Sequence, residues 1–346
     1  MRLTTWIPKR VAVDVEGNTY VTGMTWATWS PWVMKYSPAK AVLWTRTTGG
    51  GGVAVGSDGN VIVTGTAETI KYDPSGTELW RAAGGRAVAV DASGSVYVAA
   101  VNHNATDDIG VTKLDRNGGV MWAQVYDSGQ YDEAVAVATD AQGNPYVAGT
   151  YGWAGNGDVR LLKYSHGGIL MWDVPYAGPY WNEALDIAVT ASGSAFVGCA
   201  EGGVLQILRY SPAGAKLADI REDYVARNAA GLALSPQGEL YVAEQWYSGG
   251  RNDFAVVALR SDLSVAWRAV HSVGDWAVPE GIAIDPAGSA VIVGYSVNTG
   301  EGASSGKARI LKLNPPPDPP VTPTGPTAVT AWLPYDYTAS STDPKG

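Results

Sequence analysis

Three glutamates occur in a similar sequence context and offer the clearest acid–base chemistry in the chain. Glu133, Glu183 and Glu280 are each followed by Ala or Gly and then by a largely apolar stretch, and Asp132 stands beside the first. If they converge at the mouth of a channel, their oxygen atoms could hold a divalent cation or act as paired carboxylates in glycoside chemistry. The alternative, in which each accepts backbone N–H groups from an adjacent loop, is favoured.

Other residue types give little support for catalysis. The histidines are His103, His166 and His271, and only a pairing of His103 with His271 across a channel would bring two of them together. The sequence contains no Gly-x-Ser-x-Gly, His-Glu-x-x-His or phosphate-loop motif. The four consecutive glycines 49–52 are expected to be a flexible link. Three aspartates instead fit the fastening of loops: Asp108, Asp158 and Asp253. We therefore expect no catalytic residue, no metal site and no cofactor.

Aromatic residues form a second group of candidates. The chain has 14 Trp and 18 Tyr but only 2 Phe, so nearly every ring carries a polar atom that favours surfaces and interfaces. One interpretation is a recognition face, where flat rings stack on sugar rings or anchor a protein partner. The other is that long loops bury their own rings. The candidate ligand-binding residues are Trp26, Trp29, Trp153, Trp181, Trp246, Trp276, Tyr151 and Tyr180.

Composition excludes several classes of function. Among 346 residues, 33 acidic and 24 basic side chains give a net charge of −9, which argues against binding to nucleic acid or to an anionic bilayer. No run of 18 apolar residues is present, so no membrane insertion is expected. The single Cys199 excludes an internal disulfide. The first residues lack the apolar core of a secretory signal, so an export signal is either absent or already removed.

A repeat with a mean spacing near 45 residues must position these candidates. A turn glycine is followed three and four residues later by two strand-forming residues, and this pattern occurs seven times. An alanine stands five residues before each glycine, flanked mainly by Val, Ile or Leu, which indicates a short buried strand before the turn. The alanines are Ala12, Ala54, Ala89, Ala138, Ala188, Ala233 and Ala283.

A second hairpin follows in each repeat. It begins with Lys-Tyr or Lys-Leu, passes a Pro, Gly or Asn turn and reaches a Trp nine residues after the Lys. In the last repeat three prolines follow Lys312-Leu313-Asn314, and proline cannot donate to a strand ladder. The pairs are Lys35 with Trp44, Lys71 with Trp80, Lys113 with Trp122 and Lys163 with Trp172, degraded to Arg209 with Ala218 and Ala258 with Trp267.

The outer strand that the last repeat lacks has a counterpart at the N-terminus. Residues 3–7 precede the first inner strand and carry Trp6. If they supply the outermost strand of the last unit, seven four-stranded sheets close into a ring without a bare edge. The predicted fold is all-β, a seven-bladed β-propeller closed by an N-terminal strand, with an extended Pro-rich C-terminal tail. The alanines would lie where inner strands converge on the axis, and the Trp residues would fill gaps that widen with radius.

These motifs resemble the bacterial SBBP seven-bladed propeller repeat. The residues that carry the resemblance are 108–115, 118–122, 136–137 and 143–150, and the pattern returns at 158–190 and 253–294. The resemblance covers about residues 3–314 and implies the fold and an extracellular or cell-surface setting, but no defined chemistry. Units two and five depart from the pattern because the segments that lead into their third strands are very short. Residues 72–80 are also similar to the tryptophan motif of quinone-dependent dehydrogenase propellers, a blade-packing device in both families.

The C-terminal part forms two further segments after the propeller of residues 1–314. Residues 315–328 are expected to be an extended linker, because seven prolines occur within residues 315–326. Residues 329–346 are expected to dock or assemble, since 329–334 nearly repeat 3–8. A strand from this tail could add to a neighbouring subunit and propagate into a fibre; folding back on its own propeller or starting a further domain are alternatives. The expected subunit contacts are Val329, Ala331, Trp332, Leu333 and Tyr335.

The sequence therefore predicts a non-catalytic extracellular or cell-surface propeller for adhesion, binding or assembly. Its partners would be other copies of itself, joined into an oligomer or filament through the tail, together with a glycan or a surface protein. The alternative is a polysaccharide hydrolase or lyase whose site lies on the aromatic and acidic loop face.

Overall fold

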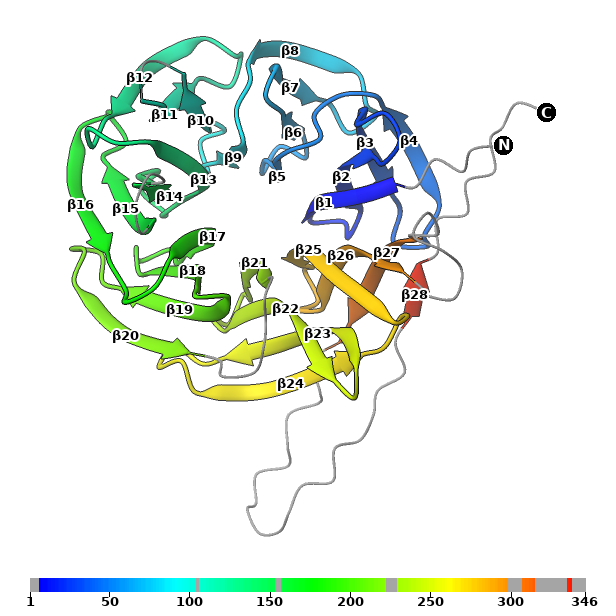
Figure 1. The fold of residues 1–346 in the computed structure, drawn as a ribbon. Helices are drawn as coiled ribbons and strands as arrows, with labels where there is room; N and C mark the ends of the chain where they lie inside the picture. The colour runs from blue at the N-terminus through cyan, green and yellow to red at the C-terminus, as the bar shows by residue number, and fades with distance from the viewer. Residues whose placement is uncertain are drawn as a thin grey trace.

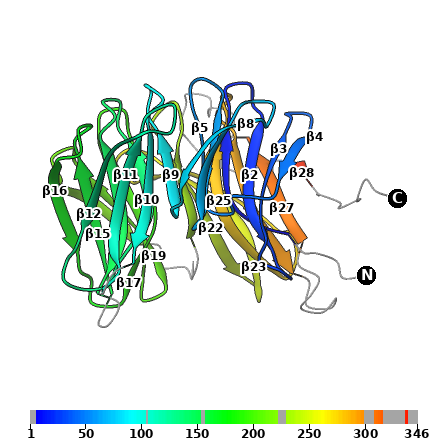
Figure 2. The same ribbon diagram turned by 90° about the horizontal axis from the view of Figure 1, so that it is seen from above.

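A computed structural model describes residues 6–103, 106–152, 157–221, 229–297, 307–314 and 335–337. These residues form an all-β propeller, with sheets arranged around a central axis (Figure 1). Within each sheet the chain runs outward, so that β1, β5, β9, β13 and β17 lie nearest the axis. Seen from the side, the strands run between two faces of a disc (Figure 2). No apolar helix long enough to cross a membrane occurs in these ranges.

Five blades are separate four-stranded antiparallel sheets. The first blade contains β1 (Trp6–Val13), β2 (Thr19–Thr25), β3 (Pro31–Tyr36) and β4 (Val42–Arg46). The second contains β5 (Val53–Val55), β6 (Val61–Thr64), β7 (Glu68–Tyr72) and β8 (Glu78–Ala83). The third is β9 (Ala87–Val90), β10 (Val96–Asn102), β11 (Asp108–Leu114), β12 (Val120–Tyr126). The fourth contains β13 (Asp132–Thr139), β14 (Pro145–Tyr151), β15 (Asp158–Tyr164) and β16 (Leu170–Tyr176). The fifth contains β17 (Asn182–Val189), β18 (Ala195–Glu201), β19 (Val204–Tyr210) and β20 (Lys216–Arg221).

The rest of the ring is one eight-stranded sheet. It contains β21 (Ala229–Leu234), β22 (Leu240–Ser248), β23 (Arg251–Leu259), β24 (Val265–His271), β25 (Trp276–Ile284), β26 (Ala290–Val297), β27 (Lys307–Leu313) and β28 (Tyr335–Tyr337). β22, β23 and β25 have nine residues each, so β23 extends far enough for Asn252 to pair in parallel with Trp276 of β25. The prediction of seven separate four-stranded blades is therefore wrong: five stand alone, and the remaining strands merge into one sheet.

The predicted closure by residues 3–7 is also wrong. Residues 6–13 form one inner strand that pairs with β2 from Trp6 to Val13, and Trp6 packs edge-on against Trp32 of the same blade at 5.0 Å. Residues 3–5 lie outside the described ranges. The outer edge of β27 is covered instead by β28, a C-terminal strand that pairs with it over three residues. In this register Tyr335 lies opposite Lys312, the position that Trp44 takes opposite Lys35 in the first blade.

The outer-strand tryptophans of the first four blades join each of them to the blade that follows. The indole N–H of Trp44 donates to the backbone oxygen of Pro74 at 3.1 Å, and Trp80 donates to Arg116 at 2.9 Å. Each indole lies over a turn glycine of the receiving blade, where an added Cβ would come within about 3 Å of the ring. The same arrangement joins Trp122 and Trp172 to the blades that follow them.

One junction replaces both partners of this contact. The fifth blade has Ala218 where the others have Trp, opposite Arg209 in the register. The receiving turn has Leu263, with a left-handed φ of 68°, where the turns that receive Trp44, Trp80, Trp122 and Trp172 have glycine. Leu263 is buried and belongs to the apolar cluster against which Ala218 packs. A small residue on the strand is thus matched by a large residue on the turn.

We expect Gly118→Ala to destabilise the ring more than Gly238→Ala. Both glycines have a φ of 86°, but a Cβ at Gly118 would meet the Trp80 ring at 2.9 Å, whereas nothing lies within 4 Å of one at Gly238. Both variants carry the cost of a left-handed alanine, about 1–2 kcal/mol. Crowding against Trp80 should add about 1–3 kcal/mol at Gly118 alone. Urea unfolding measures both; equal losses would mean that the indole contact contributes little.

Candidate functional site

The inner strands approach the axis with a recurring irregularity. In β1, β13, β17, β21 and β25 the register with the second strand skips one residue. Glu280 is the skipped residue of β25, whereas Glu133 pairs with Thr150 and Glu183 with Ala200, two residues ahead of the corresponding skip. Glu133 and Glu183 are therefore equivalent, as the sequence indicated, but Glu280 is not. The residues skipped are Lys9, Val135, Leu185, Ala230 and Glu280.

Glu280 joins the two ends of the ring near the axis. Its carboxylate accepts a hydrogen bond from Lys9 Nζ at 2.8 Å, and its backbone oxygen accepts one from Arg10 Nη1 at 2.8 Å. Both donors lie on β1, so β25 and β1 are held together by a charged contact. The three expected glutamates thus do not form one carboxylate cluster.

Arg10 also stabilises an acidic group inside the channel. Asp186 of β17 accepts the backbone N–H of Leu232 at 2.8 Å, which links β17 to β21. Burial raises the pKa of the Asp186 carboxyl, and the positive charge of Arg10 opposes that rise. The charge of Arg10 therefore offsets part of the effect of burial on Asp186, while the Arg10 guanidinium itself donates to the backbone oxygens of Lys9 and Glu280.

A cavity of about 360 Å³ opens at the channel mouth. Part of its wall is backbone, because Gly50, Gly51, Gly65 and Gly85 line it and a Cβ added to any of them would come within 3 Å of another group. A Cβ at Gly65 would overlap the carbonyl oxygen of Gly49. The N–H of Gly51 donates to Thr64 at 3.0 Å, and that of Gly85 donates to Gly65 at 2.9 Å. The expected flexible link at residues 49–52 is thus part of a hydrogen-bonded wall.

The charged part of this channel-mouth cavity comes from β1, β13, β17 and the residue before β9. Arg86 forms an ion pair with Glu133. Glu183 also lines the cavity, and among the described residues its carboxylate has neither an ion pair nor a hydrogen bond. Partial burial raises the pKa of Glu183, and the negative charge of Glu133 raises it further. Glu183 is the lining carboxylate left without a cation.

A second cavity, of about 440 Å³, lies beside the first and shares Arg86 and Glu133 with it. His103 lines it and lies 2.9 Å from Asp107, measured from Nδ1 to Oδ1. His166 instead lies in the β15–β16 turn, where its ring contacts Lys113. His271 ends the outer strand β24. The three histidines therefore belong to three different parts of the ring and make no common site.

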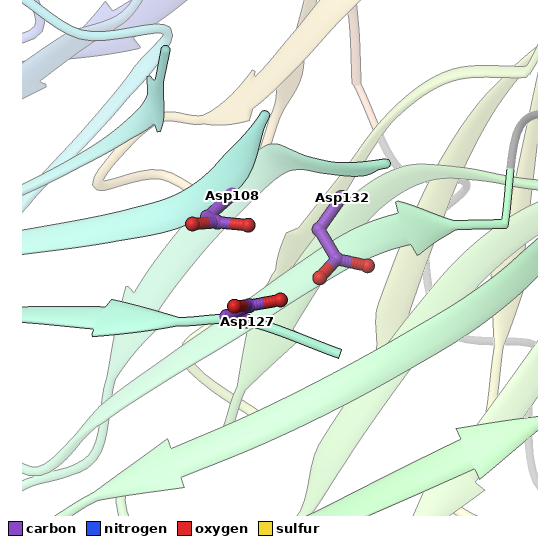
Figure 3. A group of neighbouring side chains, drawn as sticks. All are labelled: Asp108, Asp127 and Asp132. Atoms are coloured by element: carbon purple, nitrogen blue, oxygen red, sulfur yellow. The ribbon is translucent and has the colours of Figure 1, made fainter. Parts of the chain in front are cut away.

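Three aspartates converge beside this second cavity (Figure 3). Asp108 begins β11, Asp127 follows β12 and Asp132 begins β13, with carboxylate oxygens within 4.8 Å of one another. Burial raises the pKa of Asp132, and the charges of Asp108 and Asp127 raise it further, although Ser128 donates two hydrogen bonds to it. Three carboxylates at this spacing suit the oxygen coordination of Ca²⁺, yet the Ser128 bonds also fit the fastening of a loop.

The candidate aromatic residues divide into exposed and packed rings. Trp181 lies against Gly157, Tyr151 lies under the Arg160 guanidinium, and Trp246 lies under Arg268. Trp153 lies outside the described ranges, as do Val329, Ala331, Trp332 and Leu333 of the tail. The exposed rings on the loop face are Trp26, Trp29, Tyr131, Tyr180, Tyr247 and Trp276, with exposed fractions between 48% and 60%.

Trp26 and Trp29 are held by a tight turn between β2 and β3. The N–H of Trp29 donates to the Thr25 oxygen at 2.8 Å, and the hydroxyls of Thr25, Thr28 and Ser30 form a hydrogen-bonded chain. Trp29 has a φ of 52°, which is unusual for a bulky residue. The two rings lie 6.0 Å apart at 32°. The turn therefore presents a pair of exposed rings in a fixed arrangement.

Comparison with known proteins establishes the fold and leaves the family open. No family model matches the chain, so the SBBP resemblance gains no support there. No curated protein matches it either. Solved structures do. A protein of unknown function from Bacteroides caccae shares 16% identity at a TM-score of 0.52, covering 73% of this chain and 93% of its own.

Two further structures match over most of their length. A chain of the mitotic checkpoint complex shares 13% identity at a TM-score of 0.58, covering 87% of this chain and 88% of its own. A protein from Lactobacillus plantarum shares 19% identity at a TM-score of 0.55, covering 84% of this chain and 91% of its own. At these identities the likeness concerns the β-propeller fold alone.

Sequence reasoning identified the acidic residues of the channel but missed the basic ones. Lys9 and Arg10 lie between residues 3–7 and the inner strand predicted around Ala12, and Arg86 follows Gly84 and Gly85. A signal was available: Arg86 precedes an inner strand by one residue, much as Glu133 does at the start of the next one. Opposite charges at these places indicate a contact between neighbouring blades.

We expect Asp127→Asn to lower the pKa of Asp132. A carboxyl whose folded pKa is raised stabilises the fold only at low pH, and this contribution is lost as pH rises through that pKa. Removing the Asp127 charge should therefore stabilise the protein at pH 7 by a fraction of a kcal/mol and leave it unchanged near pH 3. Carbon-13 NMR titration of Asp132 and urea unfolding at both pH values measure this.

Added Ca²⁺ separates this expectation from a metal site. If the three aspartates hold the ion, millimolar Ca²⁺ should raise the Tm of the wild type, and Asp127→Asn should reduce that gain. The equivalent link before β17 lacks this aspartate cluster. Ala177 and Asn182 stand there at the positions that Asp127 and Asp132 take in the link before β13.

Proposed function

We propose that this propeller is a non-catalytic binding module, extracellular or at the cell surface, whose exposed loop-face aromatics hold a glycan. The observation that supports it best is the Trp26–Trp29 turn. Its rings are 53% and 60% exposed, although burial of such rings is strongly favourable in water. A turn that holds two rings outward loses little conformational entropy when a flat ligand stacks on them.

The other exposed rings extend this surface around the channel mouth. Tyr131 and Tyr180 precede Glu133 and Glu183 in the links that enter β13 and β17, and Trp276 begins β25. A sugar chain suits such a surface, because its rings have apolar faces for stacking and hydroxyls for the polar rim. Trp181, Trp246 and Tyr151 stay candidates for this surface, although each also packs against its own loop or a neighbouring Arg.

The SBBP resemblance remains the reason to propose the cell surface as the setting. A repeat with structural motifs and no catalytic signature suits adhesion and surface display. The exposed aromatics are consistent with that role, since adhesive contact with a glycan needs a stacking surface and no reaction.

The C-terminal strand provides a route to assembly, which we propose as the second part of the function. β28 pairs with β27 over three residues only, while β27 has seven. Twenty residues, 315–334, precede β28, and such a length spans at most about 70 Å. The same strand can therefore pair with β27 of a neighbouring subunit and link propellers into an oligomer or filament.

Trp29→Gly should abolish much of the glycan binding without harming the fold. Glycine adopts positive φ at no steric cost, so the variant should be as stable as the wild type or about 1 kcal/mol more stable. Loss of one stacking ring should weaken binding about tenfold, equal to about 1.4 kcal/mol. A glycan microarray identifies the probe, and calorimetry with that oligosaccharide gives the affinities.

Leu79→Ala is the matched control, because Leu79 is 50% exposed but lies on the outer strand β8, away from the loop face. It should bind as the wild type does. Unchanged binding by Trp29→Gly, or no signal on the array from the wild type, would count against a glycan-binding face.

A chain ending at Asn314 should stay monomeric, whereas the intact chain should form concentration-dependent oligomers. Removing β28 also bares the outer edge of β27, so the shortened chain should unfold at a lower urea concentration. Light scattering and electron microscopy of both chains measure this. Monomers in both preparations would leave β28 as a strand that closes only its own ring.

A further inference from the structure

The channel-mouth cavity contains one charge that the fold does not compensate. Three cations, Lys9, Arg10 and Arg86, and two carboxylates, Glu133 and Glu183, line it; Glu280 and Asp186 lie outside the lining and contact or face two of these cations. Glu280 is paired with Lys9 and Glu133 with Arg86. Arg10 provides the positive charge that acts on Asp186. Glu183 remains, exposed to the cavity and without a partner among the described residues.

The polar wall of the cavity contains backbone and threonine groups, and three of its oxygens, Gly51 O, Gly65 O and Thr150 Oγ1, also accept hydrogen bonds from the protein. Backbone atoms of Gly50, Gly51, Gly65 and Gly85 line it, together with the side chains of Thr66 and Thr150. A volume of about 360 Å³ lies at the lower end of the range for small-molecule sites, about 300–1,000 Å³. A ligand of this size with one positive charge and several hydroxyl groups would match both the free carboxylate and the wall.

We propose that the channel-mouth cavity binds an amino sugar, whose primary ammonium group pairs with the Glu183 carboxylate. The hydroxyls of the sugar then meet backbone oxygens and threonine hydroxyls of the wall. This site stands apart from the loop-face aromatics, since Trp29→Gly leaves Glu183 and the cavity lining in place.

The charge balance favours an ammonium group over a metal ion or an anion. A divalent cation needs several oxygen ligands, but the Glu133 carboxylate is already held by Arg86. An anion would have to approach Glu183 against like charge. An ammonium group would pair with Glu183, the lining carboxylate that has no ion pair among the described residues.

Binding should depend on pH in a defined direction. The ammonium group pairs with the ionised form of Glu183, so affinity is lost as pH falls through the raised pKa of this residue. Arg10, Arg86 and Glu133 face the same cavity. Lys9 is paired with Glu280 rather than with Glu183. Asp186 interacts electrostatically with Arg10.

Calorimetry at pH 7 with D-glucosamine as the probe tests the proposal on the full chain. The wild type should bind D-glucosamine saturably and bind N-acetyl-D-glucosamine, which lacks the charge, at least tenfold more weakly. Glu183→Gln should weaken D-glucosamine binding at least tenfold. Glu16→Gln is the matched control, because Glu16 lies in the β1–β2 turn on the opposite face, and it should leave affinity unchanged. Absence of saturable binding to the wild type, or equal affinity for both sugars, overturns the proposal.

A second measurement on the wild type avoids any doubt about folding of the variant. Carbon-13 NMR titration follows the Glu183 carboxyl with and without saturating D-glucosamine. A bound ammonium group should lower its pKa by at least half a unit, whereas an unchanged pKa contradicts the assignment. Both results are independent of the glycan array, so this proposal and the loop-face proposal can fail separately.

Discussion

The contact between an outer-strand indole and the turn of the following blade determines how the ring holds together. Sheets in a propeller touch along faces that diverge with radius, so the largest side chains are needed at the rim. Trp44, Trp80, Trp122 and Trp172 fill this space and each donates an N–H to the neighbouring turn. Because four neighbouring junctions are fixed in this way, the inner strands of these blades keep the spacing that leaves a cavity at the channel mouth.

The repeat was visible in the sequence because it reflects this packing. Small residues near the axis and Trp at the rim recur at fixed distances, and they predicted the propeller fold and the order of strands within each blade. The way the ring ends was not predictable in the same manner. Trp6 was assigned to the rim from its type alone, whereas its contact with Trp32 places it in the first blade. The merging of β23 with β25 depends on strand length, which the repeat pattern does not encode.

The candidate site was predictable only in part. Glu133 and Glu183 were found because they precede apolar strands, but whether a carboxylate is paired depends on residues of other blades. Arg86, Lys9 and Arg10 are distant in sequence from the acids that they contact. The skip in the inner strands moved Glu280 by two positions relative to Glu133, and no local pattern distinguishes a skipped residue from a paired one. The exposure of Trp29 likewise depends on its positive φ, which the sequence around it does not predict.

The exchange of Trp and Gly for Ala218 and Leu263 at one junction has a consequence for the evolution and redesign of this ring. A blade has a donor side and an acceptor side, and the two junction types exclude each other: a Trp would collide with Leu263, and an Ala opposite a glycine would leave a void. Duplication or transplantation of a single blade therefore succeeds only between junctions of the same type. The fifth blade and the sheet that receives it therefore form a matched pair, which distinguishes this junction from the four indole–glycine junctions.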